Sequence, residues 1–128
     1  MISGIWRSID DKTGYEKAVI EVIQNPDGSF GGTILEVLAE PGKTAETTCI
    51  NCPAPFTNKP IKGTHFLWGL KPEKSNPRQF SGGRVLDPLN GHIYNAKINV
   101  EANGQELTLR GFLGISLLGR SQVWFRQI

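Results

Sequence analysis

Residues 92–101 read HIYNAKINVE and have the clearest periodic pattern of the chain. Its apolar residues, Tyr94, Ala96, Ile98 and Val100, alternate with polar ones. Because successive side chains of a β-strand point to opposite faces, this period of two predicts a strand with one buried and one solvated face. Residues Glu106–Leu113 repeat the pattern. Between the two strands, Asn103-Gly104 is a strong signal for a two-residue hairpin turn.

The same pattern, followed along the chain, marks eight strand-like segments joined by turns. They are Gly4–Ile9, Lys17–Gln24, Ser29–Leu38, Thr64–Leu70, Gln79–Leu86, Gly91–Glu101, Glu106–Leu113 and Arg120–Ile128. Asn25–Gly28 and Asp87–Gly91 place proline and glycine where tight turns use them. No long segment has the apolar period of a helix. We therefore expect an all-β, eight-stranded antiparallel up-and-down barrel, because closure removes the exposed edges of the sheet.

The composition fits one small domain and excludes several classes of protein. A chain of 128 residues builds one domain with one core, here residues 1–128. The net charge of +2 is too small and too even for a nucleic-acid groove. No run approaches the ~18 apolar residues of a membrane-spanning helix. No signal peptide is visible at the start of the sequence.

One connection is much longer than the others. Residues 39–63 contain four prolines, no periodic pattern and both cysteines of the chain. Loops without secondary structure that exceed about 12–15 residues usually have a function. We therefore interpret residues 39–63 as a lid over one end of the barrel.

Cys49 and Cys52 are separated by only two residues. Four interpretations stay open. A redox centre of the thioredoxin type needs a βαβ context, which is missing. A zinc site needs four ligands, and His65 and His92 do not have the spacing of a zinc finger. The pair is otherwise two reduced thiols or a local disulfide that stiffens the lid. We favour the disulfide, which requires an oxidising compartment.

The second half of the chain carries a series of short motifs. They are Gly82-Gly83, Asp87-Pro88 with Gly91 and Tyr94, Arg110-Gly111, and Gly119-Arg120 with Gln122, Trp124 and Arg126. Asn58–Gly63 and the Cys-x-x-Cys before it also fit. This combination resembles a bacterial family of small exported proteins of unknown function that look lipocalin-like. The resemblance implies a lipocalin-like barrel in the periplasm or outside the cell, whose export signal is missing from this sequence.

The two ends of the chain carry a further likeness. Gly4-Ile5-Trp6 matches the Gly-x-Trp that opens lipocalins, in which an arginine of the last strand packs on the tryptophan. Arg126 is the first candidate for this arginine and Arg120 the second. Closure of a barrel brings the first and last strands together, and a guanidinium plane stacks well on a tryptophan face. We therefore predict that Trp6 and Arg126 close the barrel.

Aromatic and polar residues of the predicted strands form a candidate ligand site. Phe66 and Trp68 share one face by alternation, and Arg84 shares a face with Phe80. Ligand pockets are mostly apolar with a few placed polar groups. The residues predicted to contact a ligand are Phe66, Trp68, Arg84, Tyr94, Gln122, Trp124 and Arg126. In the alternative, the aromatic rings form an ordinary core, Tyr94 makes a structural corner, Arg126 binds backbone carbonyls at the seam and Arg84 lies on the surface.

These features predict a binding protein that holds a small apolar or amphipathic molecule, such as a lipid or fatty acid, in the barrel lumen. We expect a monomer or weak dimer. The alternative is an interaction module with a barrel filled by its own side chains, whose apolar segment Phe112–Leu118 docks a protein partner or the cell envelope. An enzyme is disfavoured because no nucleophile or acid–base pair is recognisable. No catalytic residue, cofactor, metal or nucleic-acid partner is expected.

Overall fold

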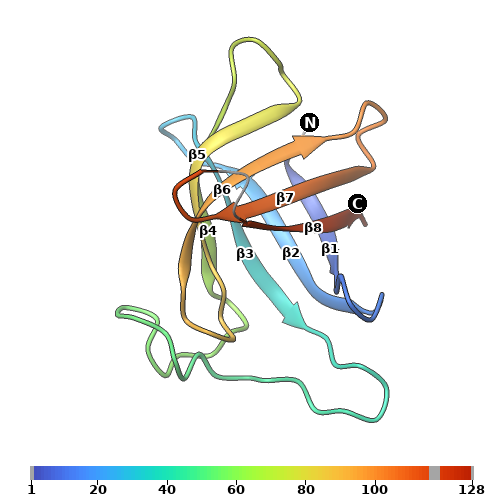
Figure 1. The fold of residues 1–128 in the computed structure, drawn as a ribbon, viewed down its shortest axis with the longest axis vertical. Helices are drawn as coiled ribbons and strands as arrows, with labels where there is room; N and C mark the ends of the chain where they lie inside the picture. The colour runs from blue at the N-terminus through green and yellow to red at the C-terminus, as the bar shows by residue number, and fades with distance from the viewer. Residues whose placement is uncertain (1, 116–118, 128) are drawn as a thin grey trace.

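The computed structural model describes residues 2–115 and 119–127. Its strands are β1 (Gly4–Ile9), β2 (Glu16–Gln24), β3 (Phe30–Val37), β4 (His65–Pro72), β5 (Gln79–Leu86), β6 (Ile93–Val100), β7 (Glu106–Phe112) and β8 (Gly119–Arg126). Each strand pairs antiparallel with the next, and β1 also pairs with β8, so that the sheet closes into a barrel (Figure 1). The predicted fold is confirmed. The predicted end of the last strand, Ile128, lies outside the described residues.

The inward-facing side chains of β6 help to fill the centre of the barrel. Ile98 pairs with Phe80 of β5 and with Leu109 of β7, and all three side chains are buried. The neighbouring residues of β6 point to the outer face, where Lys97 is half-buried and Asn99 is exposed. The period of two therefore assigns every second side chain of this strand to the core.

Side chains fill the middle of the barrel. Trp6, Leu67, Leu70, Leu107 and Trp124 each have 0% exposed surface. A side chain without exposed surface has no water-sized void beside it, as in a close-packed protein interior. The space between the rings of Trp6 and Trp124 is therefore a packed core.

The first and last strands meet in a short seam. β1 and β8 pair over four positions, from Trp6 opposite Arg126 to Ile9 opposite Val123. The guanidinium carbon of Arg126 lies 4.3 Å from the centre of the Trp6 ring. Arg126 also donates hydrogen bonds to the carbonyl oxygens of Gly104, at 2.7 Å, and Ser3, at 2.9 Å. The predicted contact of Trp6 with Arg126 is present and holds the seam.

Two glycine pairs bend the sheet, as expected for strands that close a small barrel. The register between β3 and β4 shifts at Gly31-Gly32, and the register between β5 and β6 shifts between Phe80 and Gly83. A Cβ atom at Gly83 would lie 2.8 Å from the side chain of Leu70 and 2.9 Å from the carbonyl oxygen of Trp68. Glycine at this position therefore allows β4 to approach β5 closely.

The turn between β6 and β7 differs from the sequence prediction. The backbone N–H of Gly104 donates to the carbonyl of Glu101 at 2.9 Å, and the N–H of Glu101 donates to Glu106 at 2.8 Å. The loop therefore spans the four residues 102–105, and the predicted two-residue turn at Asn103-Gly104 is wrong. Gly104 has a φ of 71°, so glycine is used here to end a longer turn.

Candidate functional site

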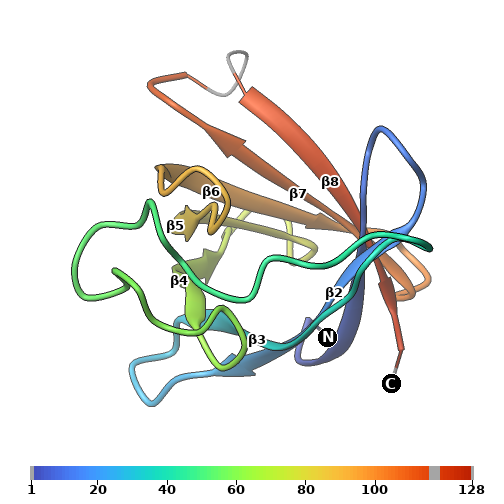
Figure 2. The same cartoon turned by 90° about the horizontal axis from the view of Figure 1, so that it is seen from below.

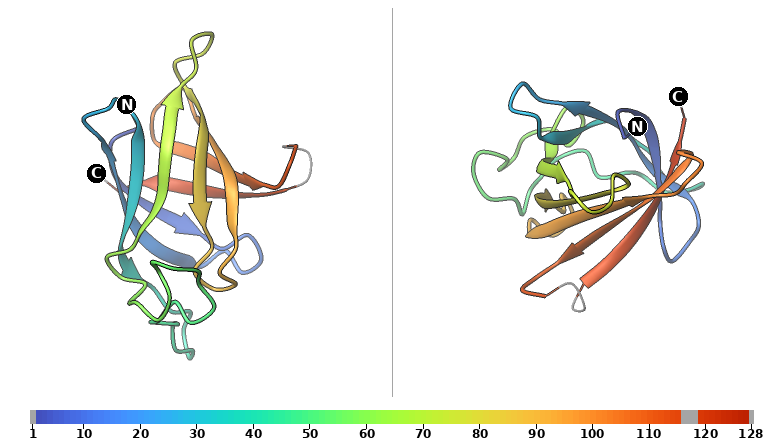
Figure 3. Two further views of the ribbon diagram at one scale, coloured as in Figure 1. Left: turned by 90° about the vertical axis from the view of Figure 1, so that its left-hand side faces the viewer. Right: turned by 90° about the horizontal axis from the view of Figure 1, so that it is seen from above.

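The two ends of the barrel differ. One end carries the N-terminus and the turns β2–β3, β4–β5 and β6–β7. Because the buried side chains of Ile2 and Val100 close it, we call it the plugged end. The loop end carries the turns β1–β2, β5–β6 and β7–β8 and the long β3–β4 connection, residues 38–64. The β4–β5 turn and the β3–β4 connection lie at opposite ends of the molecule (Figure 3).

The β3–β4 connection packs against the barrel at the loop end (Figure 2). Cys49, Cys52 and Ile61 are buried and belong to the main hydrophobic core. A disulfide joins Cys49 to Cys52. Of the four interpretations of this cysteine pair, the local disulfide is therefore confirmed. It makes residues 49–52 a compact turn whose apolar side faces the core.

The disulfide turn rests on the β5–β6 turn. The sulfur atoms of Cys49 and Cys52 lie 3.9 Å and 3.7 Å from the carbonyl oxygen of Pro88. A Cβ atom at Gly91 would lie only 1.7 Å from the carbonyl oxygen of Asn51. No other residue type fits at Gly91 while the two turns remain in contact, so this glycine joins the connection to the barrel.

Four of the seven predicted ligand residues, Phe66, Tyr94, Gln122 and Trp124, lie on the inner face of the barrel. The ring centres of Phe66 and Trp124 are 6.2 Å apart, and both side chains are buried. The indole N–H of Trp124 donates to Oε1 of Gln122 at 3.3 Å. Tyr94 precedes the buried Ala96 by two residues, and its hydroxyl accepts a hydrogen bond from the amide of Asn90 at 3.2 Å.

These four side chains differ in burial and polarity. Phe66 and Trp124 are buried, whereas Gln122 and Tyr94 are half-buried. An apolar floor next to a few hydrogen-bonding groups is the usual lining of a small-molecule site. The inner face therefore offers both an apolar and a polar contact.

Trp68 and Arg84 lie on the opposite face. Trp68 pairs with Arg84, and Arg84 pairs with Asn95, which alternates with the inward-facing Tyr94 and Ala96. The register shift before Gly83 turns Arg84 outward, and the irregular pairing of β3 with β4 lets Leu67 follow Phe66 into the core. The predictions that Arg84 faces inward and that Trp68 shares the face of Phe66 were therefore wrong.

The outer wall near Trp68 is covered by the β3–β4 connection. The ring of Phe56 stacks on that of Trp68 with centres 6.1 Å apart and planes 25° apart. Arg126, the remaining candidate, lies at the plugged end over Trp6. The structure therefore does not place Trp68, Arg84 or Arg126 beside the other four predicted residues.

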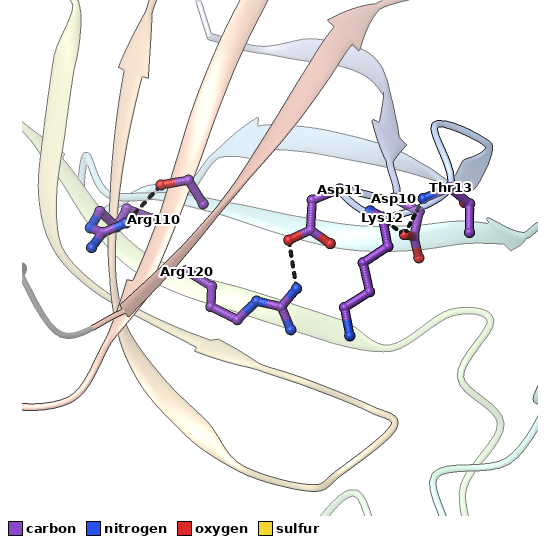
Figure 4. A network of polar contacts seen from close by, with 7 residues as sticks. Asp10, Asp11, Lys12, Thr13, Arg110 and Arg120 are labelled. Atoms are coloured by element: carbon purple, nitrogen blue, oxygen red, sulfur yellow. Dashed lines mark hydrogen bonds and ion pairs between the residues drawn. The ribbon is translucent and has the colours of Figure 1, made fainter.

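An ion pair at the loop end was missed by the sequence analysis. Arg120 at the start of β8 binds Asp11 of the β1–β2 turn, with Nη2 to Oδ2 at 2.5 Å (Figure 4). The hydrogen bond that Arg120 donates to Asp11 lowers the pKa of Asp11 and raises the pKa of Arg120. The sequence could have predicted this ion pair from barrel closure, because closure places the β1–β2 turn beside the start of β8.

The adjacent Asp10 shapes the β1–β2 turn. Its carboxylate accepts hydrogen bonds from the backbone N–H of Lys12 at 2.8 Å and of Thr13 at 3.1 Å. The Lys12 bond is the main cause of the lowered pKa of Asp10. The loop end is therefore bordered by carboxylates that are ionised at neutral pH.

Within residues 2–115 and 119–127, no group of three or more His, Cys, Asp or Glu side chains is placed to hold a metal ion. The same residues contain no helix that is long and apolar enough to cross a membrane.

Comparisons with known proteins agree with the geometry. A family model described as "Uncharacterized protein conserved in bacteria (DUF2147)" matches residues 4–126. The chain is similar to protein HP1028 from the human pathogen Helicobacter pylori, whose structure is described as belonging to the lipocalin family. The TM-score is 0.81 at 21% sequence identity, over 100% of this chain and 84% of that chain. This likeness shows a lipocalin-like fold. No curated protein matches the sequence.

Proposed function

The chain belongs to the DUF2147 family of bacterial proteins. We propose that it binds a small apolar or amphipathic molecule at the loop end of its barrel. One observation carries the proposal. The inner face combines the buried aromatic rings of Phe66 and Trp124 with the half-buried, hydrogen-bonding side chains of Gln122 and Tyr94. This combination suits a ligand with one apolar and one polar end.

The packed core limits where such a ligand can bind. Trp124 and Leu107 have no exposed surface, so the middle of the barrel has no room for a guest. The apolar part of the ligand would instead lie on the half-buried ring of Tyr94 and the exposed edge of Phe66 at the loop end. Its polar end would meet the amide of Gln122 and the hydroxyl of Tyr94. The ligand is therefore short, or it displaces core side chains as it enters.

The β3–β4 connection controls access in this proposal. Its disulfide turn is buried against Pro88 and Gly91, so a ligand enters only when this contact opens. The disulfide keeps residues 49–52 compact during such a movement. The connection would then act as a hinged lid.

We also propose that the protein works in an oxidising compartment, the periplasm or the outside of the cell. The support is the disulfide between Cys49 and Cys52, because such bonds persist mainly outside the reducing cytosol. A thiol count on protein isolated from the native bacterium would test this. If an alkylating agent added at cell lysis modifies two thiols per chain, the proposal is contradicted.

The binding proposal is tested by titrating the protein with dodecanoate and following the indole N–H signal of Trp124 by NMR. We expect a saturable shift of this signal. Gln122→Ala and Tyr94→Phe should each weaken binding about 2- to 10-fold, since each removes one hydrogen-bonding group. Arg84→Gln on the outer face is the matched control and should bind normally. A signal that does not move, or equal effects of all three variants, would sink the proposal.

A second candidate function is an interaction module, favoured by apolar side chains at the β7–β8 turn. Leu113 and Ile115 are 58% and 60% exposed. Residues 116–118 of the predicted segment Phe112–Leu118 lie outside the described residues. Exposed apolar side chains that lie close together often mark a contact surface. Sedimentation over a concentration series tests self-association, and loss of any oligomer in Leu113→Ser would support this candidate.

A further inference from the structure

A shallow cleft of about 170 Å³ lies outside the barrel, on the wall formed by β5 to β8. Besides Glu73, its polar lining residues are Gln79, Lys97, Asn99, Thr108, Arg110 and Ser121. Four of these residues, Lys97, Asn99, Thr108 and Arg110, alternate with the buried Ile98 and Leu109 of β6 and β7 and point outward. The cleft is therefore separated from the loop end by the wall itself.

Two cations lie side by side in this cleft. Lys97 of β6 is directly opposite Arg110 of β7 in the strand register, and both are half-buried. Like charges that face each other across two strands destabilise a sheet. The strand register therefore places two positive charges next to each other on the outer face.

Both cations are held in position by neighbours. Arg110 donates a hydrogen bond to Oγ of Ser121 at 2.9 Å, drawn in Figure 4. The ammonium of Lys97 lies 5.8 Å from the centre of the Phe112 ring, a weak cation–π contact. A cationic site whose side chains are already placed loses less entropy when it binds an anion.

The remaining groups of the cleft also suit an oxyanion. Ser121 and Thr108 supply hydroxyls, and Asn99 and Gln79 supply amides. Glu73 is the one carboxylate of the lining, so the cleft keeps a positive balance. Among the described residues, no carboxylate lies within 4.0 Å of the Lys97 ammonium. The volume equals that of about six water molecules, enough for a group of five heavy atoms.

We propose that this cleft binds a tetrahedral oxyanion, phosphate or sulfate, either free or as the exposed group of a larger molecule. Lys97 supplies a point charge, and Arg110 supplies a planar donor that matches two oxygens of the anion. The hydroxyls of Ser121 and Thr108 complete the donor set. The proposal is independent of the ligand at the loop end.

The test is an NMR titration of the full chain with inorganic phosphate and, separately, with sulfate, at an ionic strength fixed with chloride. We expect saturable shifts of the backbone signals of Lys97, Arg110 and Ser121. Lys97→Gln and Arg110→Gln should each reduce the affinity about 5- to 10-fold, and Arg110→Lys should reduce it less because it keeps the charge. Lys71→Gln removes an exposed charge of β4 outside the cleft and should bind the anion like the natural protein.

The source of the anion is distinguished by vesicles. Binding to phosphatidylglycerol vesicles, but not to phosphatidylcholine vesicles, with competition by phosphate would identify a lipid headgroup. Phosphate or sulfate binding without vesicle binding would identify a soluble anion. Shifts that rise linearly without saturation, or an equal loss of affinity in Lys71→Gln and Lys97→Gln, would show only general charge screening and would overturn the proposal.

Discussion

Arg126 is the residue on which the seam between β1 and β8 depends most. Its guanidinium stacks on Trp6 and binds two backbone carbonyls. Arg126→Ala removes the stack and leaves the two carbonyls without this donor. We expect the free energy of unfolding, measured with urea, to fall by about 2–3 kcal/mol. Arg84→Ala removes an exposed arginine with a single 3.4 Å contact and should change it by less than about 0.5 kcal/mol. Similar losses for both variants would show that the seam does not rely on Arg126.

Three aspartates predict how stability depends on pH. Hydrogen bonds from the Lys12 backbone, the Arg120 side chain and the Ser29 hydroxyl lower the pKa of Asp10, Asp11 and Asp27 respectively. The unfolded chain binds these protons at pH about 4, above the folded values. Their stabilising contribution is therefore complete above pH about 4 and is lost as the pH falls through the lowered folded pKa values.

Urea unfolding at a series of pH values between 7 and 2 checks this dependence. We expect Asp10→Asn combined with Asp27→Asn to flatten the acid part of the curve and to leave its shape above pH about 5 unchanged. An acid limb as steep as that of the natural protein would contradict the assignment.

The sequence predicted the positions of some side chains correctly and of others wrongly. The contact of Trp6 with Arg126 was predictable because barrel closure requires the first and last strands to meet. Arg84 and Trp68 were misplaced because simple alternation assumes an unbroken ladder. The register shift before Gly83 reverses the face of the residues that follow it. The sequence shows the glycine pair but not the size of the shift.

At the scale of elements, the contact between the β3–β4 connection and the β5–β6 turn depends on Gly91. Gly91 and Gly42 have φ values of 79° and 78°, so alanine at either position meets the same backbone strain. A Cβ atom at Gly91 would collide with Asn51, whereas at Gly42 it would meet nothing within 4 Å. Gly91→Ala should therefore reduce the free energy of unfolding by about 1–3 kcal/mol more than Gly42→Ala.

Limited proteolysis adds a local readout of this contact. Cleavage within residues 39–63 should become faster in Gly91→Ala than in Gly42→Ala, because the connection leaves the barrel. Equal cleavage rates and equal stabilities would mean that the contact with Asn51 does not anchor the connection.

The elements themselves were largely predictable. Alternation and turn residues predicted the bounds of β1 to β7 and the start of β8 to within two residues. The path of the β3–β4 connection was not predictable, because it has no repeating pattern. Cys49 and Ile61 are buried by contacts with segments distant in the sequence, including the turn at Pro88. Such contacts leave no periodic signal.

At the scale of the whole molecule, eight strands build a barrel near the size at which side chains can fill the interior. The sequence predicted closure, since an antiparallel meander leaves exposed edges otherwise. It did not reveal how far the lumen is filled, because alternation gives the direction of side chains and not the space between them. The packing of Trp6, Phe80, Leu107 and Trp124 restricts the proposed ligand to the loop end.

Binding of a small apolar or amphipathic molecule at the loop end can be tested with a native mass spectrum of the protein produced in an oxidising compartment, followed by a denatured spectrum. We expect an adduct that is lost on denaturation, or uptake of dodecanoate when it is offered, at one molecule per chain. A bare protein that takes up neither dodecanoate nor any other offered lipid would contradict this proposal.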